Sequence, residues 1–239
     1  MQWLIFGATG YTGSALLAEC IALGHSVWAH VRPNSSRRAV IEQECHNGLN
    51  ANAAILDFTV GAIEDLIQRV QPSHIALCLG TTKAKAKLDR QRGEPNGYAQ
   101  IDRDLSVMVI EAAQRLEIDT CICYVSSMGA DKPRGNAYLQ ARHDVEQLLM
   151  GSGLRYIIVR PAFISGSDRS EFRLGERVGS VIGDALLQGV GLLGFKNAQA
   201  AYGSLSAQDL AKGLMAAAES EEVAQLLYPQ HLRYHLQIR

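Results

Sequence analysis

Three glycines at intervals of three residues, Gly7, Gly10 and Gly13, directly follow an apolar segment over residues 2–6. Such glycines permit a tight turn, and a helix that begins there offers its backbone N–H groups and partial positive charge to an anion. A strand before the turn and a helix after it are typical of sites for the pyrophosphate of a dinucleotide. The residues expected to contact the dinucleotide are Gly7, Thr9, Gly10, Tyr11, Thr12 and Gly13.

Apolar segments alternate with segments of helical periodicity along the first two thirds of the chain. The expected strands cover residues 2–6, 26–31, 53–56, 74–79, 120–125 and 155–159, and the expected helices cover residues 13–23, 37–44, 60–70, 98–116 and 138–150. Continuous apolar strands, each followed by a helix, are typical of a parallel sheet covered on both faces. The sequence therefore predicts a doubly wound α/β fold, the Rossmann fold, in a single domain of residues 1–239.

The regular pattern ends after Pro161. Residues 163–205 contain many glycines without strict alternation, and we expect them to form a small irregular C-terminal cap that contacts the substrate. Ser206 and Asp209 then form the S-x-x-D pattern of a helix N-cap, which predicts a helix over residues 206–218.

Composition argues against several classes of partner. Lys and Arg total 23 and Asp and Glu total 24, so the net charge of -1 gives no reason to expect nucleic acid or an anionic membrane as a partner. No apolar run approaches the roughly 18 residues of a membrane span. The five cysteines and seven histidines lack metal-binding spacing, so no metal site is predicted. We expect buried, reduced cysteines and a cytoplasmic location.

The end of the second expected strand bears on the choice of dinucleotide. NAD-specific sites place a carboxylate there to bind the adenosine 2′-hydroxyl, whereas this strand ends at Arg32, and Arg37 follows nearby. A guanidinium suits a 2′-phosphate, which a carboxylate would repel. The sequence therefore favours NADP(H) over NAD(H), with solvated loop arginines as the alternative. Asp57, after the third strand, either flanks the adenine or caps the next helix.

A second group of residues points to chemistry at the same edge of the sheet. Tyr138 and Arg142 share one face of an expected helix, and Ser126 and Ser127 end the preceding strand. With the glycine turn, they make the chain resemble the atypical branch of the short-chain dehydrogenase/reductase superfamily. A closer resemblance, to small reductases related to the human Tat-interacting protein 2 oxidoreductase, is carried by residues 78–82, 101–104, 126–131, 138–140, 160–161 and 171–174.

This resemblance implies an NADP(H)-linked oxidoreductase that acts on a small carbonyl or alcohol substrate. In that family Tyr138 would be the general acid/base, and Ser127, with Ser126 as the alternative, would hydrogen-bond the substrate oxygen. The resemblance further implies that the cofactor ribose and nicotinamide contact Leu79, Gly80, Thr81 and Pro161.

One position departs from the family pattern, because Arg142 stands where the family has a lysine. The lysine favours the phenolate form of the tyrosine and binds the nicotinamide ribose; arginine brings charge and donors in a planar, bulkier head. Arg142 therefore supports two readings: a reductase in which it fills both roles, or an NADP(H)-binding sensor with little turnover. A surface pair of Tyr138 and Arg142, a non-redox member of the fold such as an epimerase, and a homodimer also stay open.

Overall fold

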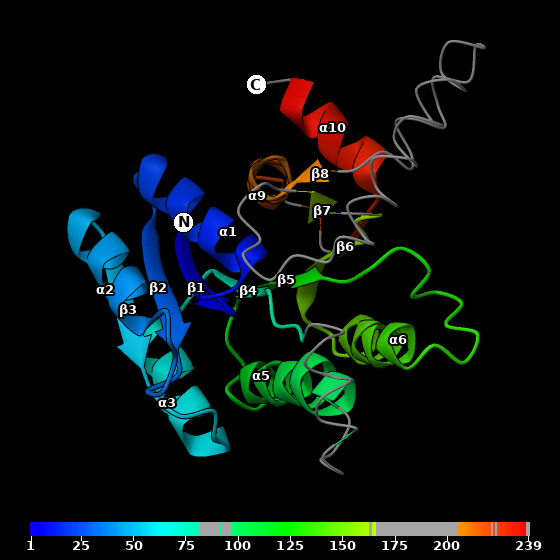
Figure 1. Ribbon diagram of the computed structural model, residues 1–239, viewed down its shortest axis with the longest axis horizontal. Helices are drawn as coiled ribbons and strands as arrows, with labels where there is room; N and C mark the ends of the chain where they lie inside the picture. Colours follow the sequence, from blue (N-terminus) through cyan, green and yellow to red (C-terminus); the bar gives the residue numbers. More distant parts are fainter. Residues whose placement is uncertain are drawn as a thin grey trace.

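A parallel sheet of seven strands forms the centre of the protein, in the order β3-β2-β1-β4-β5-β6-β9 (Figure 1). The computed structural model describes residues 1–81, 91, 97–162, 164–165, 205–220, 222 and 224–237. Every neighbouring pair in the sheet is parallel, so the predicted doubly wound Rossmann fold is confirmed. The strands are β1 (Gln2–Phe6), β2 (Ser26–Val31), β3 (Ala51–Ile55), β4 (His74–Leu77), β5 (Cys121–Val125), β6 (Arg155–Val159) and β9 (Ala224–Leu227).

Helices cover both faces of this sheet (Figure 1). One face carries α1 (Tyr11–Ala22), α2 (Arg38–Asn47), α9 (Ala207–Ala218) and α10 (Pro229–Gln237). The other carries α3 (Val60–Val70), α5 (Leu105–Arg115) and α6 (Ala137–Met150). A π-helix, η1 (Tyr98–Asp104), leads into α5. Two short strands, β7 (Ile164–Ser165) and β8 (Leu205–Ser206), pair with each other in a separate parallel sheet.

The two faces of the sheet have separate cores, and single strands contribute to both. In β1, Trp3 and Ile5 pack with α1 and α9, whereas Leu4 and Phe6 pack with α3 and α5. Successive strand residues point to opposite faces, so a strand covered on both sides is apolar at nearly every position. The continuous apolar runs in the sequence therefore indicated, correctly, a sheet with helices on both faces.

The structure differs from the sequence-based expectations mainly in the last third of the chain. The predicted start of α9 is confirmed, because the Ser206 side chain accepts the N–H of Asp209 at 3.0 Å. Strand β9 and helix α10 were not expected; β9 is a four-residue edge strand in which only alternate side chains are buried. The expected helix over residues 98–116 divides into η1 and α5. Most of the cap expected over residues 163–205 lies outside the described residues.

All five cysteines are free; four are buried and Cys78 is half-buried. In the part of the chain that the structure describes, no helix combines the length and the apolar character that a membrane crossing requires.

Candidate nucleotide-binding and active site

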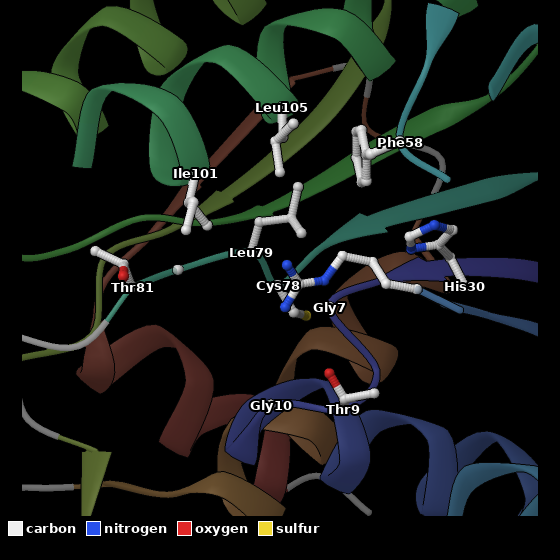
Figure 2. A pocket seen from close by; sticks show the side chains of 12 residues that line it. Gly7, Thr9, Gly10, His30, Phe58, Cys78, Leu79, Thr81, Ile101 and Leu105 are labelled. Atoms are coloured by element: carbon white, nitrogen blue, oxygen red, sulfur yellow. The ribbon is translucent and has the colours of Figure 1, made fainter. Parts of the chain in front are cut away.

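A cleft of about 240 Å³ opens between the carboxyl ends of β1 and β4 (Figure 2). The chain proceeds from β1 to β2 on one side and reaches β4 on the other, so this is the point where strand order reverses and where such sheets bind ligands. Seven predicted cofactor residues meet there, namely Gly7, Thr9, Gly10, Arg32, Leu79, Gly80 and Thr81. The remaining lining residues are His30, Phe58, Cys78, Ile101 and Leu105.

The glycine turn lies too close to neighbouring backbone to accept side chains. Gly7 has a φ of +90°, and a Cβ placed on it would lie 2.6 Å from the carbonyl oxygen of Cys78 in the segment after β4. A Cβ on Gly13, in the first turn of α1, would overlap the carbonyl group of Gly7. The N–H of Gly10 donates to the Gly7 carbonyl at 2.9 Å and closes the turn.

The N-terminus of α1 has no side-chain cap. The side chains of Thr59, Asn136 and Ser206 cap α3, α6 and α9, whereas the N-cap residue of α1 is Gly10 and its first turn has no acidic residue. The positive end of α1 therefore faces the cleft without a neutralising side chain among the described residues. Together with the space left by the glycines, this donor set fits the pyrophosphate of a dinucleotide.

Two predicted arginines lie beside this turn. Arg32, directly after β2, lines the cleft. Arg37, in the segment before α2, donates from Nη1 to the carbonyl oxygen of Thr9 at 2.8 Å. The chain therefore places two cations near the end of β2, where NAD-specific sites have a carboxylate.

Two aromatic side chains, His30 in β2 and Phe58 shortly after β3, line one part of the cleft and lie next to each other (Figure 2). The His30 ring lies edge-on to Phe58 with centroids 5.0 Å apart, and it lies 5.3 Å from the Phe6 ring. Its Nε2 is 3.1 Å from the carbonyl oxygen of Leu56, and burial lowers the pKa of His30 to about 4. The imidazole is therefore neutral near pH 7. Because it is buried and meets Phe58 edge-on, the half-buried Phe58 is the ring of this pair that is better placed to contact a purine.

Asp57 is exposed and does not line the cleft, although Phe58 next to it does. The alternative role for Asp57, capping the next helix, is wrong. Thr59 caps α3 by accepting the N–H of Ala62 at 3.4 Å.

Tyr138 lies in the first turn of α6, which Asn136 caps by accepting the N–H groups of Tyr138 and Leu139 at 3.0 and 3.2 Å. The tyrosine is half-buried, with its ring 5.4 Å from that of Tyr98 in η1. The guanidinium carbon of Arg142 lies 5.2 Å from the centre of the Tyr138 ring. The predicted tyrosine–cation pair is thus present, and the reading of it as a surface pair is wrong because Arg142 is buried.

The guanidinium of Arg142 is held by protein groups on two sides. Nη2 donates to the carbonyl oxygen of Leu79 at 3.0 Å and to the Asp102 carboxylate at 2.6 Å. Nη1 donates to the carbonyl oxygen of Val125 at 2.9 Å and, at 3.4 Å, approaches the hydroxyl of Tyr124. Within the described part of the chain, Nε has no hydrogen-bond partner. A ribose contact of Arg142 stays a prediction, for which Nε is the remaining donor.

The two candidate serines have different surroundings. Ser126 is buried and donates to Glu146 Oε1 at 2.5 Å, and the same carboxylate receives Nε and Nη2 of Arg160 at 2.9 and 2.5 Å. Ser127 is half-buried and makes a long contact of 3.4 Å to the carbonyl oxygen of Met128. The hydroxyl of Ser126 is therefore committed to a buried ion pair, whereas that of Ser127 is held only weakly.

Pro161, which follows the end of β6, is buried, and its carbonyl oxygen accepts the N–H of Met128 at 3.0 Å. This bond brings the predicted nicotinamide-backing residue next to the loop that carries Ser127. Tyr11 and Thr12 occupy the first turn of α1.

Asp102 and Glu146 were not expected as site residues, although the sequence carries a signal for each. Asp102 shares a helix face with the buried Ser106 and Val109, and Glu146 shares one with the buried Leu149. A carboxylate on an otherwise buried helix face must be paired, because burying an isolated charge is costly. The spacing of residues in the sequence thus indicates that each carboxylate needs a partner, but it does not identify that partner. In the structure the partner of Asp102 is Arg142, and the partner of Glu146 is Arg160.

The fold, the glycine turn and the cleft at the reversal point define an NAD(P)-binding Rossmann protein. A family model described as NAD(P)H-binding matches residues 7–186, and the chain belongs to this family. It is 32% identical over 176 residues to the protein HTATIP2 of Rattus norvegicus, covering 72% of this chain and 66% of that protein. The predicted resemblance to the short-chain dehydrogenase/reductases is thereby confirmed.

Two further proteins are similar to this chain. The protein FMP52, mitochondrial, of Candida glabrata is 26% identical over 171 residues, which cover 71% of this chain and 66% of that protein. The matches thus span slightly less than two thirds of the length of both relatives. The enzyme WbmH of Bordetella bronchiseptica, solved with NAD+, superposes with a TM-score of 0.66 and 14% identity over 95% of this chain and 75% of that chain. At this identity the likeness shows the fold alone.

Replacing Gly13 by alanine tests the close packing of the turn. Alanine usually stabilises a helix relative to glycine by up to about 1 kcal/mol, but at Gly13 its Cβ would collide with backbone. We expect Gly13→Ala to lower the free energy of unfolding in urea and to abolish dinucleotide binding. The matched control is Gly61→Ala in α3, where a Cβ meets no atom within 4 Å; it should raise stability and leave binding intact. Equal stability gains in both variants would contradict the packing argument.

The burial of His30 predicts that the free energy of unfolding decreases in acid. Its pKa is lowered from 6.5 to about 4 by burial, so the folded state binds fewer protons than the unfolded state between these values. Its contribution to stability is therefore complete above pH 6.5 and disappears as the pH falls to about 4. Between pH 7 and 5, the wild type should lose up to about 2 kcal/mol more unfolding free energy than His30→Gln. Parallel pH profiles in urea titrations would refute this assignment.

Proposed function

We propose that the protein is an NADP(H)-dependent reductase that acts on small carbonyl compounds. The observation that carries the proposal is the position of Arg32 and Arg37 beside an uncapped, glycine-lined helix N-terminus. These groups form one anion-binding surface with donors for a pyrophosphate and, at the end of β2, two cations suited to a 2′-phosphate.

The lining of the cleft suggests an order for the parts of the dinucleotide. The adenine would pack against His30 and Phe58, the pyrophosphate would bind at Gly10, and the nicotinamide ribose would lie along Leu79, Gly80 and Thr81. When bound, the reduced nicotinamide supplies a hydride to the carbonyl carbon.

The residues of the chain then handle the oxygen of the substrate. Ser127 would donate a hydrogen bond to it, since Ser126 is already bonded to Glu146. Tyr138 would donate the proton that converts this oxygen to a hydroxyl. The guanidinium of Arg142, 5.2 Å from the tyrosine ring, would stabilise the negative charge left on the phenol oxygen.

A second candidate function is an NADP(H)-binding sensor with little turnover. A specific observation favours it: both terminal nitrogens of Arg142 already bind protein groups, so only Nε is left for a ribose hydroxyl. In the resembling family a lysine supplies that contact. Binding without efficient reaction would follow if Nε does not make it.

The cytoplasmic location and the homodimer are further parts of the proposal. The location is inferred from the unpaired cysteines, although one relative is named as mitochondrial. Sedimentation of the purified protein measures its oligomeric state directly.

Charge reversal at Arg32 tests the choice of cofactor. Arg32→Glu removes a cation from the 2′-phosphate and adds a repulsive carboxylate, so the Kd for NADPH should rise by about 10- to 100-fold while that for NADH changes little. Isothermal titration calorimetry measures both constants. Arg115→Glu, an exposed position on α5 away from the cleft, is the charge-matched control. An equal effect of Arg32→Glu on both nucleotides would contradict a 2′-phosphate site.

Removal of the Tyr138 hydroxyl separates the two candidate functions. For a reductase, Tyr138→Phe should slow carbonyl-dependent NADPH oxidation by about 100-fold or more, because general acid catalysis is lost, while the Kd for NADPH stays within about twofold. Tyr156→Phe, in β6, is the control and should keep wild-type rates. NADPH binding by the wild type without oxidation across a broad carbonyl panel would instead favour the sensor.

A further inference from the structure

The segment Leu79–Thr81 is fixed on one side by two buried side chains that come from distant parts of the sequence. Asp102, fully buried in η1, accepts the N–H of Thr81 on Oδ2 at 2.8 Å and Nη2 of Arg142 on Oδ1 at 2.6 Å. The same Nη2 donates to the carbonyl oxygen of Leu79 at 3.0 Å. The backbone groups on both sides of Gly80 are therefore bonded to one ion pair.

Gly80 is the position where this arrangement leaves no room. A Cβ at Gly80 would lie 2.8 Å from Nη2 of Arg142 and 3.5 Å from Oδ1 of Asp102. Its φ is not in the left-handed region, so the requirement for glycine comes from the ion pair behind it. Gly80 also lines the nucleotide cleft, as do Leu79 and Thr81 (Figure 2). One side of this segment thus meets the ion pair, and its residues form part of the wall that a nucleotide would touch.

The ion pair is itself anchored to the sheet. Nη1 of Arg142 donates to the carbonyl oxygen of Val125, the last residue of β5, at 2.9 Å. Burial raises the pKa of the Asp102 carboxyl, and the adjacent guanidinium and the N–H of Thr81 oppose that rise by binding the carboxylate. The planar guanidinium reaches Leu79, Asp102 and Val125 at once from two nitrogens. A lysine has one nitrogen on a flexible stem and cannot reproduce this fork.

We propose that Asp102 and Arg142 are positioning residues that hold Leu79–Thr81 in the conformation that binds the nicotinamide half of NADP(H). This inference rests on the proposed cofactor site and deepens it. It also gives Arg142 a role other than that of the family's lysine: its terminal nitrogens act on the cofactor through the backbone around Gly80. The lysine of the family is therefore not an equivalent residue in this chain, and introducing it weakens the site.

The test compares Asp102→Asn, Arg142→Lys and Gly80→Ala with the wild type. Each variant should raise the Kd for NADPH, measured by calorimetry, by about tenfold or more, the equivalent of one lost charge-assisted hydrogen bond. In the nucleotide-free protein, hydrogen exchange of the Thr81 amide should become faster in all three. The double variant Asp102→Asn/Arg142→Lys should lose less affinity than the product of the single effects, because both act on one segment.

Two controls separate positioning from general destabilisation. Leu149→Ala, in the same helix as Arg142 but in the core away from the cleft, should lower the Tm while leaving the Kd and the Thr81 exchange rate unchanged. Arg115→Lys makes the same substitution at an exposed ion pair and should change none of the three measurements.

The outcomes distinguish this inference from the function on which it rests. Wild-type affinity in all three variants, with a lowered Tm, would mean that the ion pair is only structural and would overturn the positioning role. Tighter NADPH binding by Arg142→Lys would overturn it as well. Absence of NADPH binding by the wild-type protein would overturn the proposed function together with this inference.

Discussion

The close approach of the β1–α1 turn to the end of β4 is the constraint on which the rest of the site depends. Gly7 lies against the backbone of Cys78, and Gly13 lies against Gly7, so neither position has space for a side chain. This packing aims the uncapped end of α1 into the cleft and sets the glycine turn opposite Leu79. Arg37 adds a bond to the same turn through Thr9. The proposed anion site is thus formed mainly by backbone groups, and side chains surround it.

Helix α6 connects this anion site with the candidate chemistry. It carries Tyr138 in its first turn, Arg142 one turn later and Glu146 one turn after that. Arg142 pairs with Asp102 and Glu146 pairs with Arg160, both in buried surroundings. Breaking one partner of a buried pair leaves an uncompensated charge, so both pairs favour the observed packing of α6. We therefore expect the orientation of Tyr138 to depend on these two ion pairs.

The sequence predicted the part of the fold that follows from periodicity. The strands β1, β2 and β6 and the helix α3 have the predicted bounds. Apolar runs and residues that end a helix can be recognised from neighbouring positions in the sequence. Strand β9 was missed, since a short edge strand with alternate burial looks like a surface loop. The candidate cofactor residues were predicted from motif positions, and seven of the fifteen line one cleft in the structure. The sequence favoured Ser127 over Ser126 only through the family resemblance, because the physical difference between them lies in the contact of Ser126 with Glu146.

The sequence by itself determined a dinucleotide-type turn, a parallel sheet covered on both faces, and the presence of an arginine where the resembling family has a lysine. Only the tertiary structure decided which groups that arginine contacts. Asp102 and Arg142 are forty residues apart in the chain and meet because η1 and α6 pack over the ends of β4 and β5. Local periodicity can report that each charge lies on a buried face. The partner of each charge is set by how the helices and strands pack against one another. The spacing of residues along a single helix cannot predict that packing.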